Sequence, residues 1–273
     1  MSSLPTNYLA PSGREEAWRF TPLARLGGLL DASVTLLDHA SLSPTELPAG
    51  ATFGKIATAP LAQNSDEATL RVRSAVSQTS ALTIAANAEI SEPIVLQRSV
   101  DGSAPEASRL LISLGANARA TVLIENTGSA VIAEEIEISL ETGSYLHFIS
   151  TQEWESKTVH LGSHHAIIGK DAQFISTVIT VGGSLVRLLP TVEYSGPGGS
   201  AELSGVYFST SGQHLEHRMH VDHNIPNCQS RVNYKGALAG ESARSVWIGD
   251  VFIRAAAEGT DTYELNRNLV LTD

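Results

Sequence analysis

The chain has 273 residues, of which 42% are hydrophobic and 17% charged, so it can bury a sizeable core in one large domain or two small ones. Its formal net charge of −11 and the lack of a basic stripe argue against a nucleic-acid binder, and its single cysteine excludes an intramolecular disulfide framework. No apolar run approaches the ~20 residues that span a bilayer and the N-terminus lacks a signal-peptide core, so we expect a cytoplasmic protein.

The first 60 residues are the most helix-like part of the sequence, and we expect a helical and irregular region over residues 1–60. Ser12 and Glu15 have the spacing of a capping box, which predicts a helix from this point. Pro22 indicates the first position of a second short helix. We interpret Trp18 and Phe20 as packing anchors.

Short β-strands are predicted from Thr69 onwards, because the apolar runs are brief and Pro93 and Pro105 interrupt any helix. The first of these predicted strands are Leu70–Val72, Ala81–Ala85, Pro93–Gln97 and Leu110–Leu114.

A repeat of glycine-containing turns follows residue 110. Gly115, Gly143, Gly169 and Gly196 are separated by 28, 26 and 27 residues, and a second turn lies between each pair. Each period therefore holds two strands and two turns. Strands without crossover helices can form a sandwich, a barrel or a solenoid, and the even period favours a solenoid. We predict a mainly β protein with a parallel β-helix over residues 61–273.

Alternation within the later strands supports this prediction. Val232, Tyr234 and Leu238 alternate with other residues along one strand, which is typical of a strand with one buried face. Earlier in the chain, Val186 and Leu188 share one face of their strand with Val192 and Tyr194. In another strand, Ile175, Thr177, Ile179 and Val181 share a face.

Four histidines, His214, His217, His220 and His223, are spaced three residues apart and suggest a metal site. In a strand, however, His214 and His220 share a face at a separation of ~20 Å, which is too far for one ion with ~2.1 Å bonds. We therefore predict no metal ligands within this stretch. The adjacent His164 and His165 point to opposite faces in the same way. Cys228 lies in a turn and lacks an identifiable neighbouring base, so we expect it to be unreactive.

No other pattern indicates catalysis. Glu134, Glu135 and Asp261 are isolated acids without a regularly spaced partner, so the paired carboxylates of glycoside hydrolysis are not indicated. The turn glycines near residues 182 and 196 lack the Lys-Ser/Thr ending of a phosphate-binding loop. We predict no catalytic residues and no cofactor bound by this chain.

Two segments resemble the SufD family, whose sister family is SufB. The first segment is Arg14-Glu15-Glu16-Ala17-Trp18-Arg19-Phe20-Thr21. The second contains His223, Pro226-Asn227-Cys228-Gln229-Ser230, Tyr234-Lys235-Gly236, Leu238, Ala243-Arg244, Gly249, Thr260-Asp261, Asn266, Asn268-Leu269, Leu271 and Asp273. The resemblance is clear over residues 10–25 and 214–273 and weaker between them.

The resemblance implies a right-handed parallel β-helix and a non-catalytic scaffold role in iron–sulfur cluster assembly. It implies two partners, SufB and the SufC ATPase, and a complex that carries a nascent cluster and reduced flavin. Family members continue into a C-terminal helical domain that binds SufC and carries a cluster-facing histidine, so we expect this chain to be a fragment without them. The residues that match the signature or are candidates for an interface are His220, His223, Cys228, Tyr263, Leu265, Asn268, Leu269 and Leu271.

A β-helix ends in an unpaired strand, and such edges recruit another chain. We therefore predict that the strand from Tyr263 to Leu271 pairs across a homodimer. Two alternatives remain open for the function. One is a β-helix enzyme acting on polysaccharide, and the other is an interaction module with no link to metal.

Overall fold

The structure is a computed structural model that describes residues 4–6, 8–38, 42–57, 60–61 and 66–271. Its first elements are a 3-10 turn, an α-helix and four short strands: η1 (Leu23–Arg25), β1 (Leu37–Asp38), β2 (Ser43–Pro44), β3 (Ala51–Ile56), α1 (Glu67–Ala75) and β4 (Thr79–Ile84). Eleven longer strands follow: β5 (Ile94–Leu114), β6 (Arg119–Leu140), β7 (Tyr145–Trp154), β8 (Val159–Ile168), β9 (Gln173–Thr180), β10 (Leu185–Tyr194), β11 (Ser200–Ser209), β12 (His214–His223), β13 (Gln229–Leu238), β14 (Arg244–Ile253) and β15 (Asp261–Val270).

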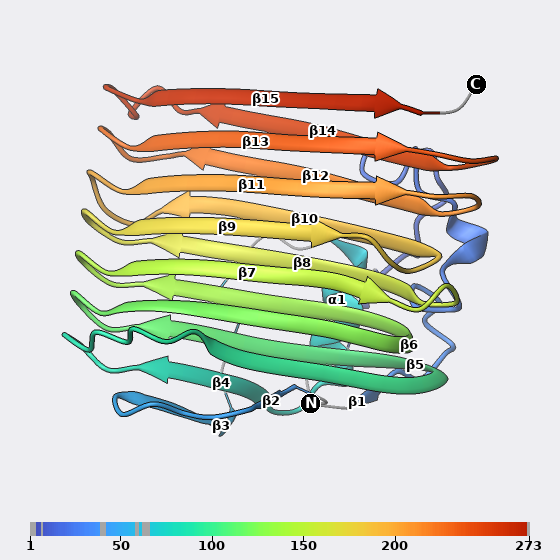
Figure 1. Cartoon of the computed structure of the whole chain (residues 1–273), viewed down its shortest axis with the longest axis horizontal. Helices are drawn as coiled ribbons and strands as arrows, with labels where there is room; N and C mark the ends of the chain where they lie inside the picture. The colour runs from blue at the N-terminus through green and yellow to red at the C-terminus, as the bar shows by residue number, and fades with distance from the viewer. Residues whose placement is uncertain (1–3, 7, 39–41, 58–59, 62–65, 272–273) are drawn as a thin grey trace.

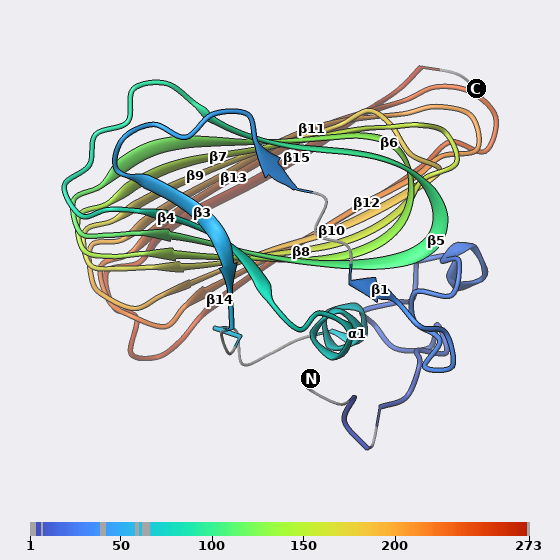
Figure 2. The same cartoon turned by 90° about the horizontal axis from the view of Figure 1, so that it is seen from below.

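The long strands stack into a parallel solenoid (Figure 1). β6 bends from one side of the solenoid to the other, and the later strands alternate between the two sides. The even strands β8 to β14 pair in parallel on one side, and the odd strands β7 to β15 pair in parallel on the other. Figure 2 shows the two sides facing each other around a flattened interior, which we call the lumen. The predicted parallel β-solenoid is therefore confirmed, and the sandwich is wrong.

The lumen is filled because successive side chains of a strand point to opposite faces. In β7, Leu146 and Phe148 are fully buried, and in β10, Val186 and Leu188 are fully buried as the alternation predicted. Burial of each such side chain contributes about 1.5–3 kcal/mol. Ile175, Thr177 and Ile179 share the outer face of β9, as expected, and are half-buried there.

The repeating turns lie where the glycine spacing predicted them, between the end of one strand and the start of the next. Gly128 is different, because it lies inside β6 where that strand bends between the two sides. Its φ of +86° is a conformation that L side chains rarely adopt, and a Cβ there would collide with the carbonyl oxygen of Val100 on the neighbouring coil. A side chain at position 128 would thus push two coils apart.

The N-terminal region covers part of the outer face of the even-numbered side, near the first residues of β8 and β10 (Figure 2). Trp18, Leu29 and Val72 are fully buried against outward-facing residues of β5, β6, β8 and β10. Arg187 of β10 holds this layer in place. Its guanidinium lies 3.8 Å from the Trp18 ring, 2.9 Å from Asp66 and 3.3 Å from Glu216.

The predicted helix beginning at Ser12 is wrong, although the expected local contact forms. The backbone N–H of Ser12 donates to the Glu15 carboxylate at 2.9 Å, but the chain continues as successive turns rather than as an α-helix. Docking of Trp18 explains this, because its indole N–H donates to Glu67 at 2.6 Å and fixes the local path of the backbone. Phe20 is 48% exposed and is not an anchor.

Two further expectations changed, and Pro105, expected only to interrupt a helix, has a place inside a strand. The second helix is only the short turn η1, with Pro22 before its first residue. The strand Leu70–Val72 is wrong, because these residues lie in α1, whose N-cap Asp66 accepts a hydrogen bond from the backbone N–H of Thr69 at 2.9 Å. Pro105 does not end a strand but sits at a register shift inside β5, where a missing backbone N–H is tolerated.

α1 spans nine residues, and no helix in the described ranges has the length and apolarity needed to cross a membrane.

Candidate functional site

A polar cluster crosses the middle of the lumen, where the interior would otherwise be apolar. Arg98 of β5 and Glu134 of β6 face each other from opposite sides and form an ion pair, with exposed fractions of 0% and 1% for their side chains. Arg98 also donates to Asn126 Oδ1 at 3.1 Å and to Ser108 Oγ at 3.0 Å. Burial raises the pKa of Glu134, but Arg98 and two nearby histidines outweigh burial and hold that pKa well below its ordinary value.

The two histidines are His160 and His164 of β8. Their Nε2 atoms lie 3.4 Å and 3.9 Å from Glu134 Oε1. His160 Nδ1 lies 2.8 Å from Gln152 Oε1, which also accepts a hydrogen bond from the Trp154 indole N–H at 2.7 Å. Since Gln152 Oε1 only accepts, His160 donates from Nδ1. Burial lowers the pKa of His160.

Further polar contacts continue along the lumen towards the last coils. His217 of β12 lies 3.0 Å from Thr180 Oγ1 of β9, and its ring stacks on Tyr207 at a centroid distance of 4.9 Å. Burial lowers the pKa of His217 to about 3, so this imidazole is neutral at physiological pH. The Tyr207 hydroxyl donates to Asn268 Oδ1 at 2.6 Å in the last strand. The contacts of His217 join the two sides of the solenoid, and the bond between Tyr207 and Asn268 joins two coils of the odd-numbered side.

The residues predicted from the signature are spread over three environments. His220 lies on the outer face of β12, 3.0 Å from Asp250. His223 points inward, stacks on Tyr194 and lies 2.9 Å from Ser230 Oγ, and burial lowers its pKa. Cys228 is fully buried in the turn before β13, and burial raises the pKa of its thiol. This sulfur is thus poorly suited to act as a nucleophile.

The other signature residues lie in or just after the last strand, β15. Tyr263, Leu269 and Leu271 are more than half exposed, Leu265 is half-buried, and Asn268 is exposed. The structure therefore gathers five of the eight candidates on one coil, and it does not bring His220, His223 and Cys228 into one cluster around a common point. Asp273 of the signature lies outside the described residues.

Sequence reasoning missed the lumen cluster and treated Glu134 and Glu135 as isolated. They belong to two different ionic groups, because Glu135 points outward and pairs with Arg73 at 2.6 Å and Arg109 at 2.8 Å. Asp261 is also paired, with Arg231. The spacing of one coil could have revealed the cluster in the sequence. Arg98 and Asn126 are register partners 28 residues apart, and so are Glu134 and Gly162.

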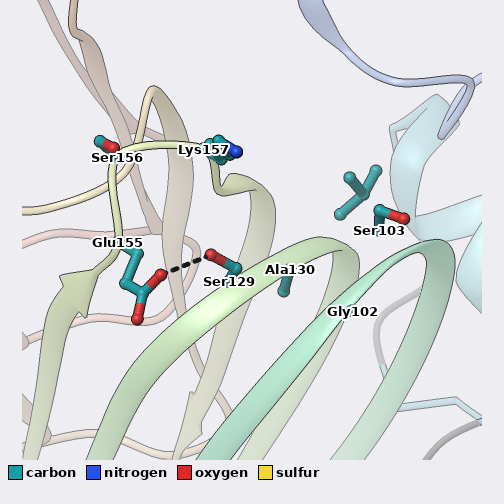
Figure 3. Close-up of a pocket in the computed structure, with 8 residues that line it drawn as sticks. Gly102, Ser103, Ser129, Ala130, Glu155, Ser156 and Lys157 are labelled. Carbon is teal, nitrogen blue, oxygen red and sulfur yellow. Dashed lines mark hydrogen bonds between the residues drawn. The ribbon is translucent and has the colours of Figure 1, made fainter.

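Two surface hollows complete the candidates. The larger, of about 460 Å³, lies at the bends of β5 and β6 and includes Ser129, whose hydroxyl donates to Glu155 at 2.8 Å (Figure 3). Its charged residues, Glu155 and Lys157, are exposed. The second, of about 390 Å³, lies between α1 and the outer face of β8 and β10 and includes His165. Within the described ranges, no three His, Cys, Asp or Glu side chains have the arrangement of a metal site.

Comparison with known proteins points to one family. The family described as "SUF system FeS cluster assembly, SufBD core domain" matches residues 97–273. An iron–sulfur cluster assembly SufBD family protein of Mycobacterium tuberculosis is 39% identical over 277 residues, covering 97% of this chain and 70% of that protein. One from Mycobacterium leprae is 39% identical over 280 residues, covering 97% and 71%. The Arabidopsis thaliana protein named "Protein ABCI7, chloroplastic" is 22% identical over 268 residues, covering 86% and 55%.

Proposed function

Because the chain belongs to the SufBD family of the SUF iron–sulfur cluster assembly system, we propose that it is a SufD-type scaffold subunit without catalytic turnover of its own. The assembly of the cluster would take place in a complex with SufB and the SufC ATPase. The nascent cluster is then cargo of the complex, and reduced flavin is a cofactor of the complex rather than of this chain. We propose that this chain is located in the cytoplasm.

The last coil supports the proposed pairing with SufB. β14 pairs only with β12, and β15 pairs only with β13, so each has one edge without a partner among the described strands. Leu269, Val270 and Leu271 on this coil are 59%, 69% and 53% exposed. An apolar strand with a free edge is a template for a strand of another chain. We propose that SufB occupies this edge, and that a second copy pairs along Tyr263 to Leu271 when SufB is absent.

The buried groups favour a scaffold over a polysaccharide-acting enzyme. Glu134 is enclosed in the lumen and paired with Arg98. On the outer face, Glu135 is held by two arginines. Neither carboxylate is placed to protonate or attack a sugar. We propose that SufC binds through a C-terminal domain of the full-length protein, since this chain spans about 70% of its mycobacterial relatives.

The test is co-expression of the full-length protein with SufB and SufC, followed by co-purification and analysis of iron and sulfide. We expect a three-component complex that holds iron and sulfide in similar amounts. Leu269→Lys with Leu271→Lys should lower recovery of SufB at least tenfold. The matched control is Ile56→Lys, which also charges an exposed apolar residue (39% exposed) but lies on β3 at the other end of the solenoid. Absence of any complex would count against the scaffold, and sugar cleavage by the isolated chain would favour the enzyme.

A further inference from the structure

The outer face of the odd-numbered side carries a small hollow, and none of the described segments lies over this face (Figure 2). The hollow has a volume of about 240 Å³ and extends across β9, β11 and β13. One row of register partners gives it a polar side: Thr177, Ser204 and Asn233. The next outward row gives it an aliphatic side that ends in a cation: Ile179, Val206 and Lys235. The hollow therefore offers hydrogen-bonding groups and apolar surface at once.

A second cation lies directly beside the hollow. Lys235 of β13 and Arg267 of β15 are register partners, so their backbones are about 4.8 Å apart and both side chains point outward. Both are exposed, and neither makes an ion pair or a hydrogen bond within the described part of the chain. Their neighbours on the same face carry no carboxylate: Val206, Asn233, Ala237, Leu265 and Leu269. Because like charges directly opposite each other are destabilising, this pair is a place for an anion.

We propose that the hollow and the two cations together form a binding site for a small organic phosphate. The phosphate group lies between Lys235 and Arg267, and the organic part lies in the hollow. The two cations stand out in a chain whose formal net charge is −11, since a local positive potential attracts an anion that the rest of the surface repels. This site goes beyond the proposed scaffold function and depends on no partner subunit.

The chemistry of the two cations favours phosphate over a carboxylate. A phosphate monoester carries a charge of about −1.5 to −2 and three strong acceptor oxygens, so it can neutralise both side chains, whereas one carboxylate would neutralise one. The guanidinium of Arg267 matches two phosphate oxygens at once, and the ammonium of Lys235 acts as a point charge.

The lining of the hollow defines the organic part. Asn233 and Ser204 offer donors and acceptors for hydroxyl or amide groups of a ligand. Val206 is 49% exposed, so its side chain is available to pack against a ring. The volume lies just below the ~300–1,000 Å³ that is usual for ligand pockets, which limits the ligand to about the size of a nucleoside monophosphate and leaves it partly in water.

Titration of the methyl-labelled chain with AMP, adenosine and inorganic phosphate, followed by NMR, tests the site. AMP should shift the methyl signals of Ile179 and Val206, and it should bind at least about fivefold more tightly than phosphate and about tenfold more tightly than adenosine, because only AMP uses both halves of the site. Lys235→Gln and Arg267→Gln should each raise the Kd of AMP at least about fivefold. The matched control Lys55→Gln, which removes an exposed lysine without an ion pair on β3, should change that Kd by less than about 1.5-fold.

A second substitution tests the hollow separately from the charges. Ser204→Leu fills the hollow and should raise the Kd of AMP at least about fivefold while leaving the Kd of phosphate within about twofold. Its control is Ser200→Leu, which adds the same side chain to the outer face of β11 outside the hollow and should leave both Kd values unchanged. Circular dichroism should show that all variants are folded. A Kd for AMP above about 10 mM would overturn the proposal. So would equal affinities for AMP and phosphate, or equal effects of Lys55→Gln and Lys235→Gln.

Discussion

Replacement of Glu134 by Gln tests whether the lumen cluster stabilises the solenoid through charge. The substitution preserves shape but leaves the Arg98 guanidinium enclosed in the lumen with only neutral acceptors, Asn126 Oδ1 and Ser108 Oγ. Removal of one partner of a buried ion pair costs about 3–5 kcal/mol. Since two hydrogen bonds to Arg98 remain, we expect a loss of about 3 kcal/mol in the free energy of unfolding, at the lower end of that range.

The pH dependence gives the same experiment a second readout. The folded-state pKa of Glu134 lies below the value of about 4.3 for an unfolded chain, so its contribution to stability is complete well above that value. The contribution is lost as the pH falls through the folded-state pKa. The difference between wild type and Glu134→Gln should therefore be constant from pH 6 to 8 and should shrink below about pH 4.

Urea unfolding followed by circular dichroism and by tryptophan fluorescence measures the effect. The control is the double variant Arg98→Met with Glu134→Leu, which removes both charges and should unfold within about 1 kcal/mol of wild type or be more stable. A loss below about 1 kcal/mol in the single variant would refute the reasoning. So would a double variant as unstable as the single one, since the cost would then come from packing rather than from an unpaired charge.

Three other results are expected from the remaining contacts. Arg187→Ala should raise the rate of amide hydrogen exchange in residues 13–30 by about 100-fold, measured by mass spectrometry. The control Arg254→Ala, which removes an exposed pair with Asp222, should change that rate less than threefold. Equal effects of the two substitutions would contradict the role of Arg187. The thiol of Cys228 should react with a chromogenic disulfide at least 100-fold faster in urea than in the folded chain, and rapid labelling of the folded chain would be inconsistent with its burial. Gly205→Ala should lower the free energy of unfolding by about 2–3 kcal/mol, because the added Cβ would lie 2.1 Å from the ring of the buried Tyr234. The control Gly54→Ala, which has open space around it, should leave that free energy unchanged. Equal urea midpoints for the two variants would argue against tight packing at Gly205.

The solenoid could be predicted because the sequence patterns that encode it, turn glycines and alternating apolar residues, are local and repeated. Turn glycines recur at nearly constant spacing, and residues such as Val232 and Tyr234 are buried on alternate positions as the pattern required. The family resemblance is confirmed at the level of the SufBD core. The N-terminal region was predicted less well, because the backbone there is set by distant contacts. Trp18 contacts Glu67 and Arg187, and no window of sequence around Trp18 contains either.

The lumen cluster was missed for a related reason. The alternation of apolar and polar residues along a strand indicates which residues point inward. An inward-facing Arg98 or Glu134 breaks this apolar pattern, so the pattern does not identify it as part of the interior. Their pairing depends on two strands that face each other across the lumen rather than on neighbours in a sheet. Aligning the chain on its coil period would have placed Arg98, Asn126 and Gln152 in one row, and this row is where the polar contacts begin.

The polar row also has a structural consequence that apolar filling cannot supply. Aliphatic residues such as Val178 and Val192 would pack almost as well if one coil slipped by two residues along its neighbour, because the side-chain period is two. The same slip would move Glu134 away from Arg98 and Gln152 away from His160, leaving buried charges and buried donors without partners. The cost of several kcal/mol for such a slip exceeds the small difference between alternative apolar packings. The lumen cluster therefore specifies the register of the coils, and through it the position of the last edge.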